Sequence, residues 1–329
     1  MVNWGVIGCG GIAKTFMASV SSTKHGKVLG CAARDLSRAQ DFAKQYDIQK
    51  AYGNYSELFS DSSIDAVYIA TTHNSHYENV MACLLAGKHV LCEKPITINA
   101  QQAKILFTEA KVRGLLLVEA VWTRFLPAII ALQEKLNAGV IGEVLSLNAT
   151  FAIQGDFDDS HRLKNRLLAG GSLLDLGIYP ITMAYLVFGE APIRIQSSAV
   201  IGDTQVDERA YILFDYSNGR NASLSCSFSH HAPTEAIIGG SEGYISVPEF
   251  LGAKTFTVYR KDAEPQVYEF NYAEGENFKA EIEDFQHCLA SGLTESNILP
   301  ANQSIMVMET MDTLRLQWGL NYPDEIENT

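Results

Sequence analysis

The residues Glu93-Lys94-Pro95 follow the apolar stretch 89–92, whose pattern is that of a buried strand. Ligands bind at the carboxyl ends of the strands in open parallel sheets, so a lysine placed there can reach into a ligand cleft. The proline fixes the backbone and cannot continue the strand ladder. The stretch therefore predicts Lys94 as a catalytic group that also meets a bound cofactor, with Glu93 beside it in the cofactor site.

A glycine-rich motif, GCGGIA, occupies residues 8–13 between an apolar strand at 2–7 and a helical stretch that reaches about Ser21. In this arrangement the first glycine permits a tight turn, and the second lets the backbone approach a pyrophosphate that rests on the helix N-terminus. The alternative is a plain glycine turn without a ligand. The flanking strand and helix favour a dinucleotide site, whose expected binding residues are Gly8, Gly10, Gly11 and Ile12.

Two arginines and a serine lie at the end of the second predicted strand, 27–33. An NAD site usually places a carboxylate at this strand end, where it accepts the ribose 2′-hydroxyl. Here Arg34 stands first, with Ser37 and Arg38 close behind, and guanidinium groups with a hydroxyl suit a 2′-phosphate. The pattern predicts NADP rather than NAD. In the alternative interpretation Asp35 binds the ribose and the arginines are solvated surface.

Polar residues also follow the buried strand 66–70, in the order TTHNSH. Their place at a strand end predicts that Thr71, His73, Asn74 and His76 lie in the cofactor cleft. For each histidine, helix capping and loop packing explain the position equally well.

A later strand, 115–119, leads to Trp122 and Arg124. We expect both to belong to the cofactor site, where Trp122 supplies an apolar wall and Arg124 an ion partner. Arg124 is explained equally well as a tie between two domains.

An acid and a phenol share one side of a predicted helix in the second half of the chain. Asp175 and Tyr179 are four residues apart in an apolar stretch that follows GGS at 170–172. Such a pair is unusual in a core helix and suggests a catalytic site. The alternatives are a buried structural carboxylate and a core tyrosine with its hydroxyl satisfied.

Strands and helices alternate from residue 2 to about 120, which predicts an α/β fold with an N-terminal Rossmann domain, a doubly wound parallel sheet, over residues 1–122. The remainder, 123–329, is richer in strands and predicts a second domain for substrate binding and oligomerisation. In its segment 222–229, apolar residues alternate with serines, so one sheet face is apolar and the other is lined with hydroxyls. The hydroxyl face is either solvated or a subunit interface.

Composition narrows the classes of partner. The chain has 329 residues and a net charge of -13, which disfavours nucleic acid. We expect no apolar run of transmembrane length, no signal peptide and no membrane partner. The six cysteines form no CxxC pair and no histidine set has zinc spacing, so we expect a reduced, cytoplasmic protein without a metal site.

These motifs together resemble the glucose–fructose oxidoreductase / inositol dehydrogenase / MocA (Gfo/Idh/MocA) family over essentially the whole chain. The resemblance rests on GCGGIA, HVLCEKP and GGSLLDLGIYP. The segments AARDLSRA, EAVWTRF and LLDLGIY are most similar to the branch of dimeric trans-1,2-dihydrobenzene-1,2-diol dehydrogenases and NADP-dependent D-xylose dehydrogenases.

The resemblance implies a C-terminal α/β domain built on an open, mostly antiparallel sheet that is often the dimer surface. It also implies that Arg34, Ser37 and Arg38 bind the 2′-phosphate, that Lys94 and Tyr179 are the catalytic pair, and that Asp175 lies in the substrate site. Relatives usually have Thr-Pro-His or Thr-Pro-Asn where this chain has TTH at 71–73. This difference affects the expected position of the loop on the nicotinamide and does not affect Lys94 or Tyr179.

The expected reaction is hydride transfer between the nicotinamide and a sugar, polyol or cyclic diol. Because an ordinary tyrosine has a pKa near ~10, a nearby Lys94 and the positive nicotinamide ring would have to lower it for Tyr179 to act as the base. Alternatively Lys94 itself moves the proton. A dinucleotide-binding sensor or regulator without turnover is the other class of function that this fold supports.

Overall fold

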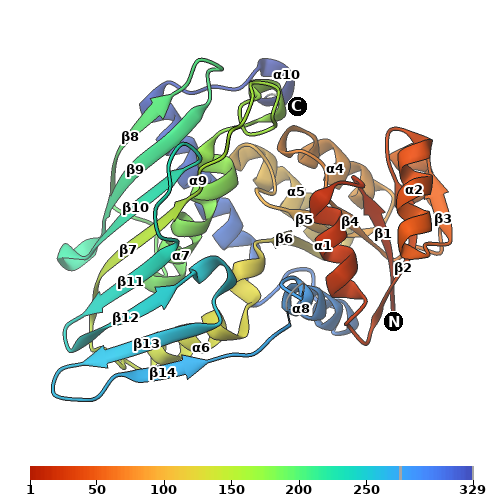
Figure 1. Cartoon of the computed structure of the whole chain (residues 1–329). Coiled ribbons are helices and arrows are strands. Elements are labelled where there is room, and N and C mark those ends of the chain that lie inside the picture. The colour runs from red at the N-terminus through yellow and green to blue at the C-terminus, as the bar shows by residue number, and fades with distance from the viewer. Residues whose placement is uncertain (274–275, 328–329) are drawn as a thin grey trace. The chain divides into compact units, whose positions relative to one another are not determined.

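The computed structural model describes residues 1–273 and 276–327, which form two compact units (Figure 1). The first comprises Met1–Trp122 and Tyr272–Ile305; the second comprises Thr123–Asn271 and Met306–Glu327. The sequence placed all of 123–329 in one second domain, whereas 272–305 lies in the first unit.

An aromatic cluster explains why part of the C-terminal half joins the first unit. Helix α8, Lys279–Ala290, brings Phe285 to 4.8 Å from the ring of Trp4, and Trp4 lies 5.4 Å from Phe16. Phe16 in turn stacks on Tyr68 at 4.0 Å, and all four side chains are fully buried. Large aromatic contacts of this kind dominate core packing.

The first unit is built on a six-stranded parallel sheet with the order β3-β2-β1-β4-β5-β6. The predicted doubly wound sheet is therefore confirmed, and its order reverses between β1 and β4, where such folds bind ligands. Its strands are β1 Val2–Ile7, β2 Gly26–Ala32, β3 Lys50–Tyr52, β4 Ala66–Ile69, β5 His89–Glu93 and β6 Leu117–Ala120. Its helices, besides α8, are α1 Gly11–Val20, α2 Leu36–Tyr46, α3 Tyr55–Ser60, α4 His76–Leu85 and α5 Ala100–Arg113.

The second unit contains an eight-stranded sheet with the order β14-β13-β12-β11-β7-β10-β9-β8. Only the β7–β10 pair is parallel, so the predicted mostly antiparallel sheet is confirmed. Its strands are β7 Val144–Ala152, β8 Arg194–Ile201, β9 Asp207–Asp215, β10 Asn221–Ser227, β11 Glu235–Gly240, β12 Gly243–Pro248, β13 Thr255–Arg260 and β14 Gln266–Glu269. The remaining helices are α6 Pro127–Asn137, α7 Ile178–Phe188, α9 Ala301–Trp318, whose first residues belong to the other unit, and α10 Asp324–Glu327.

The alternation in β10 sorts its side chains between the two faces of the sheet. Ala222, Leu224 and Cys226 are buried on the face that α7 covers, while Ser223 is exposed and Ser225 half-buried on the other (Figure 1). The predicted apolar and hydroxyl faces are therefore present over 222–226, whereas Ser227, expected on the hydroxyl face, is buried.

One apolar stretch corrects the expectation that no run reaches transmembrane length. Arg166–Phe188 is long and apolar enough to cross a membrane by length and composition. However, 94% of its apolar window is buried inside the protein, as in the core helix of a globular unit.

Candidate active site

The loop after β1 has the geometry that the glycine motif predicts. Gly8 has φ +83°, and a Cβ there would lie 2.5 Å from the carbonyl oxygen of Ala70, so only glycine fits without strain. Its N–H donates to the carbonyl of Ala32 at 3.2 Å, which fixes the loop against β2. At Gly10 and Gly11, by contrast, an added Cβ would meet nothing within 4 Å. The backbone therefore has open space beside it where a ligand can approach closely.

Helix α1 begins in this loop and offers its N-terminus to an anion. Gly10 is its N-cap, no side chain caps it, and no acidic residue stands in its first turn. Free N–H groups and the helix dipole then favour a bound phosphate. Ile12 lies in this first turn and is 39% exposed. The residues present thus fit the pyrophosphate of a dinucleotide.

The end of β2 presents two exposed guanidinium groups, Arg34 and Arg38. Between them, Asp35 serves as the N-cap of α2 and accepts hydrogen bonds from the N–H and hydroxyl of Ser37, both at 2.8 Å. These hydrogen bonds hold the pKa of the Asp35 carboxyl below its usual range. The carboxylate is therefore occupied by its own helix, and the Ser37 hydroxyl already donates to it.

Tyr55, at the start of α3, is a neighbour of these arginines that the sequence reasoning missed. It is half-buried, burial raises the pKa of its phenol, and the charges of Arg34 and Arg38 act in the opposite direction. An aromatic residue directly after the third strand was the only available signal.

His76 ties together the two loops that follow β4 and β5. Its ring is fully buried, with Nδ1 2.7 Å from the carbonyl oxygen of Pro95 and Nε2 3.1 Å from that of Thr71. Burial, assisted by neighbouring His73, lowers the pKa of His76 to about 4. A neutral imidazole donates from one nitrogen only, and the shorter distance indicates the bond to Pro95.

The other polar residues after β4 form a compact 3₁₀ turn, His73–Ser75. His73 is 8% exposed, and its ring lies 5.9 Å from that of His76. Asn74 accepts a hydrogen bond from the Thr72 hydroxyl at 2.7 Å, and the Thr71 hydroxyl accepts one from Asn79 at 3.3 Å.

Lys94 follows β5 in a turn with a cis peptide bond to Pro95. Glu93, buried at the strand end, accepts hydrogen bonds from the Tyr68 hydroxyl and from the backbone N–H of Lys94. One strand across, the buried carboxylate of Glu119 accepts a hydrogen bond from the N–H of Ile96 at 2.8 Å. Burial raises the pKa of Glu119.

A helix cap completes this turn. Asn99 caps α5 by accepting a hydrogen bond from the N–H of Gln102 at 2.9 Å, and the Gln102 side chain accepts one from the N–H of Ile98 at 3.4 Å. The backbone beside Lys94 is thus held by side chains of β6, α4 and α5. The sequence reasoning missed Glu119 and Gln102, because their contacts depend on the register of distant elements.

Trp122 and Arg124 belong to different units. Trp122 is half-buried, with its ring 5.8 Å from that of Phe278 in the first unit. Arg124 lies in the second unit, is only 3% exposed, and burial lowers its pKa to about 10.

The second unit positions Asp175 and Tyr179 around an irregular helical turn. Leu173–Gly177 is π-helical, with the N–H of Ile178 donating to the carbonyl of Leu173, and α7 follows directly. Such turns are frequent at functional sites. Both residues are 5% exposed, and the Tyr179 ring meets that of Phe151 edge to face at 5.8 Å.

Arg162 is a partner of Asp175 that the sequence reasoning missed. It makes a two-pronged ion pair, with Nη1 2.9 Å from Oδ1 and Nη2 3.2 Å from Oδ2. Arg162 comes from the irregular segment 156–169, and its side chain is 48% exposed. A bidentate pair of this kind fixes the orientation of the carboxylate.

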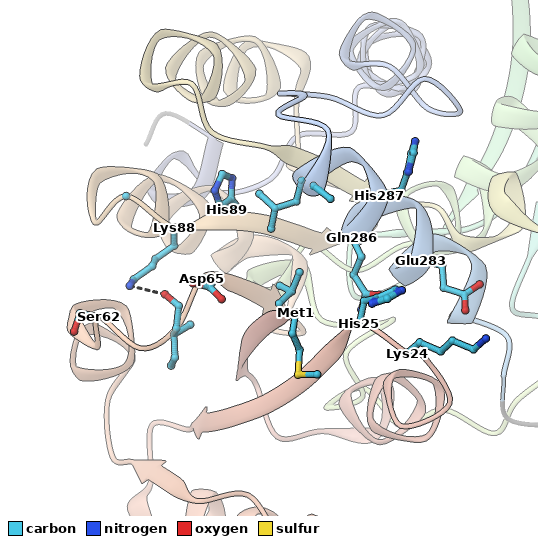
Figure 2. A pocket seen from close by; sticks show the side chains of 15 residues that line it. Met1, Lys24, His25, Ser62, Asp65, Lys88, His89, Glu283, Gln286 and His287 are labelled. Atoms are coloured by element: carbon cyan, nitrogen blue, oxygen red, sulfur yellow. Dashed lines mark hydrogen bonds between the residues drawn. The ribbon is translucent and has the colours of Figure 1, made fainter.

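A pocket lies at the opposite, amino-terminal edge of the first sheet. Figure 2 shows it between the starts of β1, β4 and β5 and helix α8, with Lys24, His25, Asp65, His89 and Gln286 among its lining residues. The predicted site residues do not line it. Within residues 1–273 and 276–327, no group of three or more His, Cys, Asp or Glu could hold a metal ion.

A parallel sheet of this order, with an open glycine loop at its switch point and a separate mixed-sheet unit, defines a two-unit protein with a dinucleotide-binding Rossmann fold. Residues 2–120 match the oxidoreductase family with an NAD-binding Rossmann fold, Gfo/Idh/MocA, and residues 129–246 match the C-terminal domain of the same family. The chain therefore belongs to the Gfo/Idh/MocA family, as its motifs predicted.

Similar proteins span nearly the full chain. Trans-1,2-dihydrobenzene-1,2-diol dehydrogenase from Mus musculus is 36% identical over 98% of this chain and 99% of its own, and that from Homo sapiens is 33% identical with the same coverage. KijD10, a 3-ketoreductase from Actinomadura kijaniata crystallised with NADP, has a TM-score of 0.81 and 28% identity over 96% of this chain and 97% of its own. An aldose–aldose oxidoreductase from Caulobacter crescentus shares the fold, with a TM-score of 0.87 and 19% identity over 97% of this chain and 98% of its own.

Proposed function

We propose that this protein is an NADP-dependent oxidoreductase that moves a hydride between the nicotinamide and a CH–OH or carbonyl group of a sugar, polyol or cyclic diol. The observation that carries the proposal is the end of β2. There Arg34 and Arg38 are exposed beside an open glycine loop, while Asp35 is engaged as a helix cap. The diol dehydrogenases and the NADP-bound ketoreductase support the same class of chemistry.

Arg34 and Arg38 hold the 2′-phosphate in this account, and the loop of Gly8, Gly10 and Gly11 with the start of α1 holds the pyrophosphate. Guanidinium groups bind phosphate through paired, charge-assisted hydrogen bonds, so two of them favour NADP over NAD. Ser37 contributes its hydroxyl as a donor to the phosphate once the hydroxyl releases Asp35.

When bound, the nicotinamide supplies the hydride acceptor or donor. Tyr179 serves as the general acid and base for the substrate hydroxyl, and Lys94 lowers its pKa and hydrogen-bonds the substrate oxygen. Asp175, oriented by Arg162, binds a substrate hydroxyl. The competing assignment gives the proton transfer to Lys94 itself, and the pH dependence of a Tyr179→Phe variant distinguishes the two.

The residues around Lys94 act by holding its backbone. We assign His76, Glu93 and Glu119 to this role, because the side chain of each makes a hydrogen bond to the backbone of the turn at 94–96. Thr71, His73 and Asn74 form the loop that meets the nicotinamide, Trp122 supplies an apolar wall, and Arg124 stabilises its own segment from a buried position.

The open face of the eight-stranded sheet is proposed as the surface of a homodimer. It carries exposed apolar side chains, Tyr211, Leu213, Tyr244 and Val267, among hydroxyl residues. All six cysteines are free thiols, which supports a reducing, cytoplasmic compartment.

The proposed function is tested by measuring the absorbance of NADPH in the presence of the purified protein. Panels of ketoses, aldoses and cyclic diones are tried with NADPH, and their reduced forms are tried with NADP. The proposal expects turnover with at least one panel, and faster turnover with NADP than with NAD. Tight NADPH binding without turnover on any panel would contradict the enzyme assignment and support a sensor.

A further inference from the structure

The segment 320–327, which includes α10, lies against the irregular segment that precedes α7 (Figure 1). The hydroxyl of buried Tyr322 donates a hydrogen bond to the carbonyl oxygen of Gly170 at 2.5 Å. Arg166 donates from Nε and Nη2 to the carbonyl oxygen of Asn321, at 2.9 and 2.6 Å. Three hydrogen bonds therefore join two stretches of the second unit that are far apart in sequence.

A buried arginine of α9 holds the segment 320–327 in place. Arg315, whose side chain is 6% exposed, forms ion pairs with Glu327 and with Asp312. Its guanidinium carbon lies 5.1 Å from the centre of the Tyr322 ring. The Glu327 carboxylate also accepts a hydrogen bond from the N–H of Tyr322 at 2.8 Å. Because both the ring and the backbone of Tyr322 are held, its hydroxyl is restricted to a narrow range of positions.

The backbone that receives this hydroxyl is tightly enclosed. At Gly170, an added Cβ would lie 2.6 Å from the carbonyl oxygen of Arg162. Gly171 has φ +125°, and an added Cβ there would lie 2.2 Å from Oδ1 of Asp207 and 3.4 Å from the hydroxyl of Tyr322. Only glycine fits at either position without displacing a neighbour. A displacement of Tyr322 is therefore transmitted to the two glycines and to the groups that enclose them.

Those enclosing groups are the ones that orient Asp175. Arg162 pairs with the Asp175 carboxylate through two contacts, at 2.9 and 3.2 Å. Asp207 accepts two hydrogen bonds, at 2.7 and 2.6 Å, from the start of the π-helical turn Leu173–Gly177 that contains Asp175. The partner of the carboxylate and the anchor of its turn thus both adjoin the two glycines that Tyr322 holds.

We propose that the segment 320–327 positions the substrate site, with Tyr322 as a positioning residue that keeps Asp175 and Arg162 in the geometry that binds a substrate hydroxyl. The inference rests on the proposed function, which assigns Asp175 to the substrate. Tyr322 itself touches neither substrate nor cofactor and acts through the two glycines and Asp207. The residues assigned to the 2′-phosphate and the pyrophosphate lie in the first unit, so Tyr322 should affect substrate affinity and leave NADPH affinity unchanged.

The positioning role is tested first without substrate or cofactor. Tyr322→Phe removes the hydrogen bond to Gly170 and keeps the ring. Hydrogen–deuterium exchange of the full-length protein, mapped on peptides, should become about fivefold faster or more over 163–178, the effect of losing one buried hydrogen bond, and stay unchanged in β1 and α1. Tyr259→Phe, a tyrosine of β13 outside this network, is the matched control and should exchange like wild type. Unchanged exchange over 163–178, or uniformly faster exchange throughout the protein, would overturn the proposal.

The consequence for the substrate is tested by steady-state kinetics with a substrate from the panels. Tyr322→Phe should raise KM about tenfold, the lower end of what one hydrogen bond to a charged group provides, with kcat nearly unchanged. In an Arg162→Ala background the same substitution should add little, because residues that act through one network are not additive. A KM equal to that of wild type, or a full tenfold effect that persists in the Arg162→Ala background, would overturn the positioning role.

A second variant covers the case in which Tyr322→Phe does not fold. Arg166→Ala removes two hydrogen bonds to Asn321 from a half-buried position and should give the same changes in exchange and KM. If wild type turns over no substrate on any panel, the proposed function fails. The exchange over 163–178 then still decides whether the segment 320–327 holds the turn that contains Asp175.

Discussion

At the scale of single residues, the turn that carries Lys94 is held by groups to which the proposed mechanism gives no chemistry. The peptide group between Pro95 and Ile96 is fixed by the ring of His76 and the carboxylate of Glu119, both buried. Such groups restrict the lysine to a narrow range of positions, which is the structural requirement for efficient catalysis. The position of Lys94 at a strand end before proline could be predicted from sequence, because it is a local pattern, and its catalytic role stays a prediction.

Replacing Lys94 by alanine tests its catalytic role. We expect turnover to fall by about 100- to 10,000-fold, the usual contribution of a positioned acid–base group, while NADPH affinity stays nearly unchanged. Steady-state kinetics and a fluorescence titration measure the two quantities. Lys111→Ala, on the exposed side of α5, is the matched control. Wild-type turnover in the Lys94→Ala variant would sink the assignment.

Among the elements, α5 shows a boundary that sequence alone could predict. Asparagine is a favoured N-cap and glycine a favoured left-handed C-cap, and the structure has Asn99 and Gly114 in these two positions. Local chemistry decides such boundaries. The π-helical turn at Leu173–Gly177 is different, because it depends on packing between distant elements.

Removing the Asn99 cap tests how much this cap contributes to the stability of the folded protein. Asn99→Ala removes the acceptor of the Gln102 N–H and should lower the free energy of unfolding by about 1 kcal/mol. Asn99→Asp, which keeps the acceptor, should be close to wild type. Urea denaturation followed by circular dichroism compares the three proteins, and equal midpoints for Asn99→Ala and wild type would contradict the cap's contribution.

The turn that carries Asp175 is anchored by another buried acid, Asp207 of β9. Its Oδ2 accepts hydrogen bonds from the Ser172 hydroxyl at 2.7 Å and the Leu173 N–H at 2.6 Å. Burial raises the pKa of Asp207 to about 6. Between the ordinary pKa of an aspartate and this value, the folded protein binds more protons than the unfolded one, so this group's contribution to stability falls as pH rises.

Asp207→Asn should remove this pH dependence. Relative to the variant, wild type should lose on the order of 3 kcal/mol between about pH 4 and pH 6 and show no further change above. Thermal unfolding of both proteins across this range gives the difference, and Asp41→Asn, an exposed position, is the control. If the stability of wild type instead rises relative to the variant as the pH rises over this range, the pKa of Asp207 is not raised in the folded protein.

At the scale of the whole molecule, the parallel sheet could be predicted from the residues, because strand–helix alternation is a local signal. The mostly antiparallel sheet was predicted from the family resemblance, and period-two alternation indicated only the two faces of its strand at 222–229. The inclusion of 272–305 in the first unit could not be predicted, because it depends on the contact of Phe285 with Trp4, and these two residues are far apart in sequence. The Arg162–Asp175 ion pair was equally hidden, since an irregular segment has no periodicity that fixes its register.

The proposed dimer makes a separate prediction at this scale. Tyr211 is 51% exposed on the open face of the eight-stranded sheet. Tyr211→Arg should convert the wild-type dimer to a monomer, because an interface core excludes an unpaired charge. Sedimentation velocity measures the change, with Lys27→Glu, an exposed position of the first unit, as control. A wild-type monomer would rule out the dimer directly.

The central claim, that this chain is an NADP enzyme because of Arg34 and Arg38, is tested most directly by titrating it with NADPH and NADH in parallel. The account predicts much tighter binding of NADPH, and a loss of about 10- to 100-fold in NADPH affinity for Arg38→Ala with little change for NADH. Asp35→Asn, which keeps the helix cap, should leave the preference intact. Equal binding of the two dinucleotides by wild type would contradict the claim and assign recognition to the ribose alone.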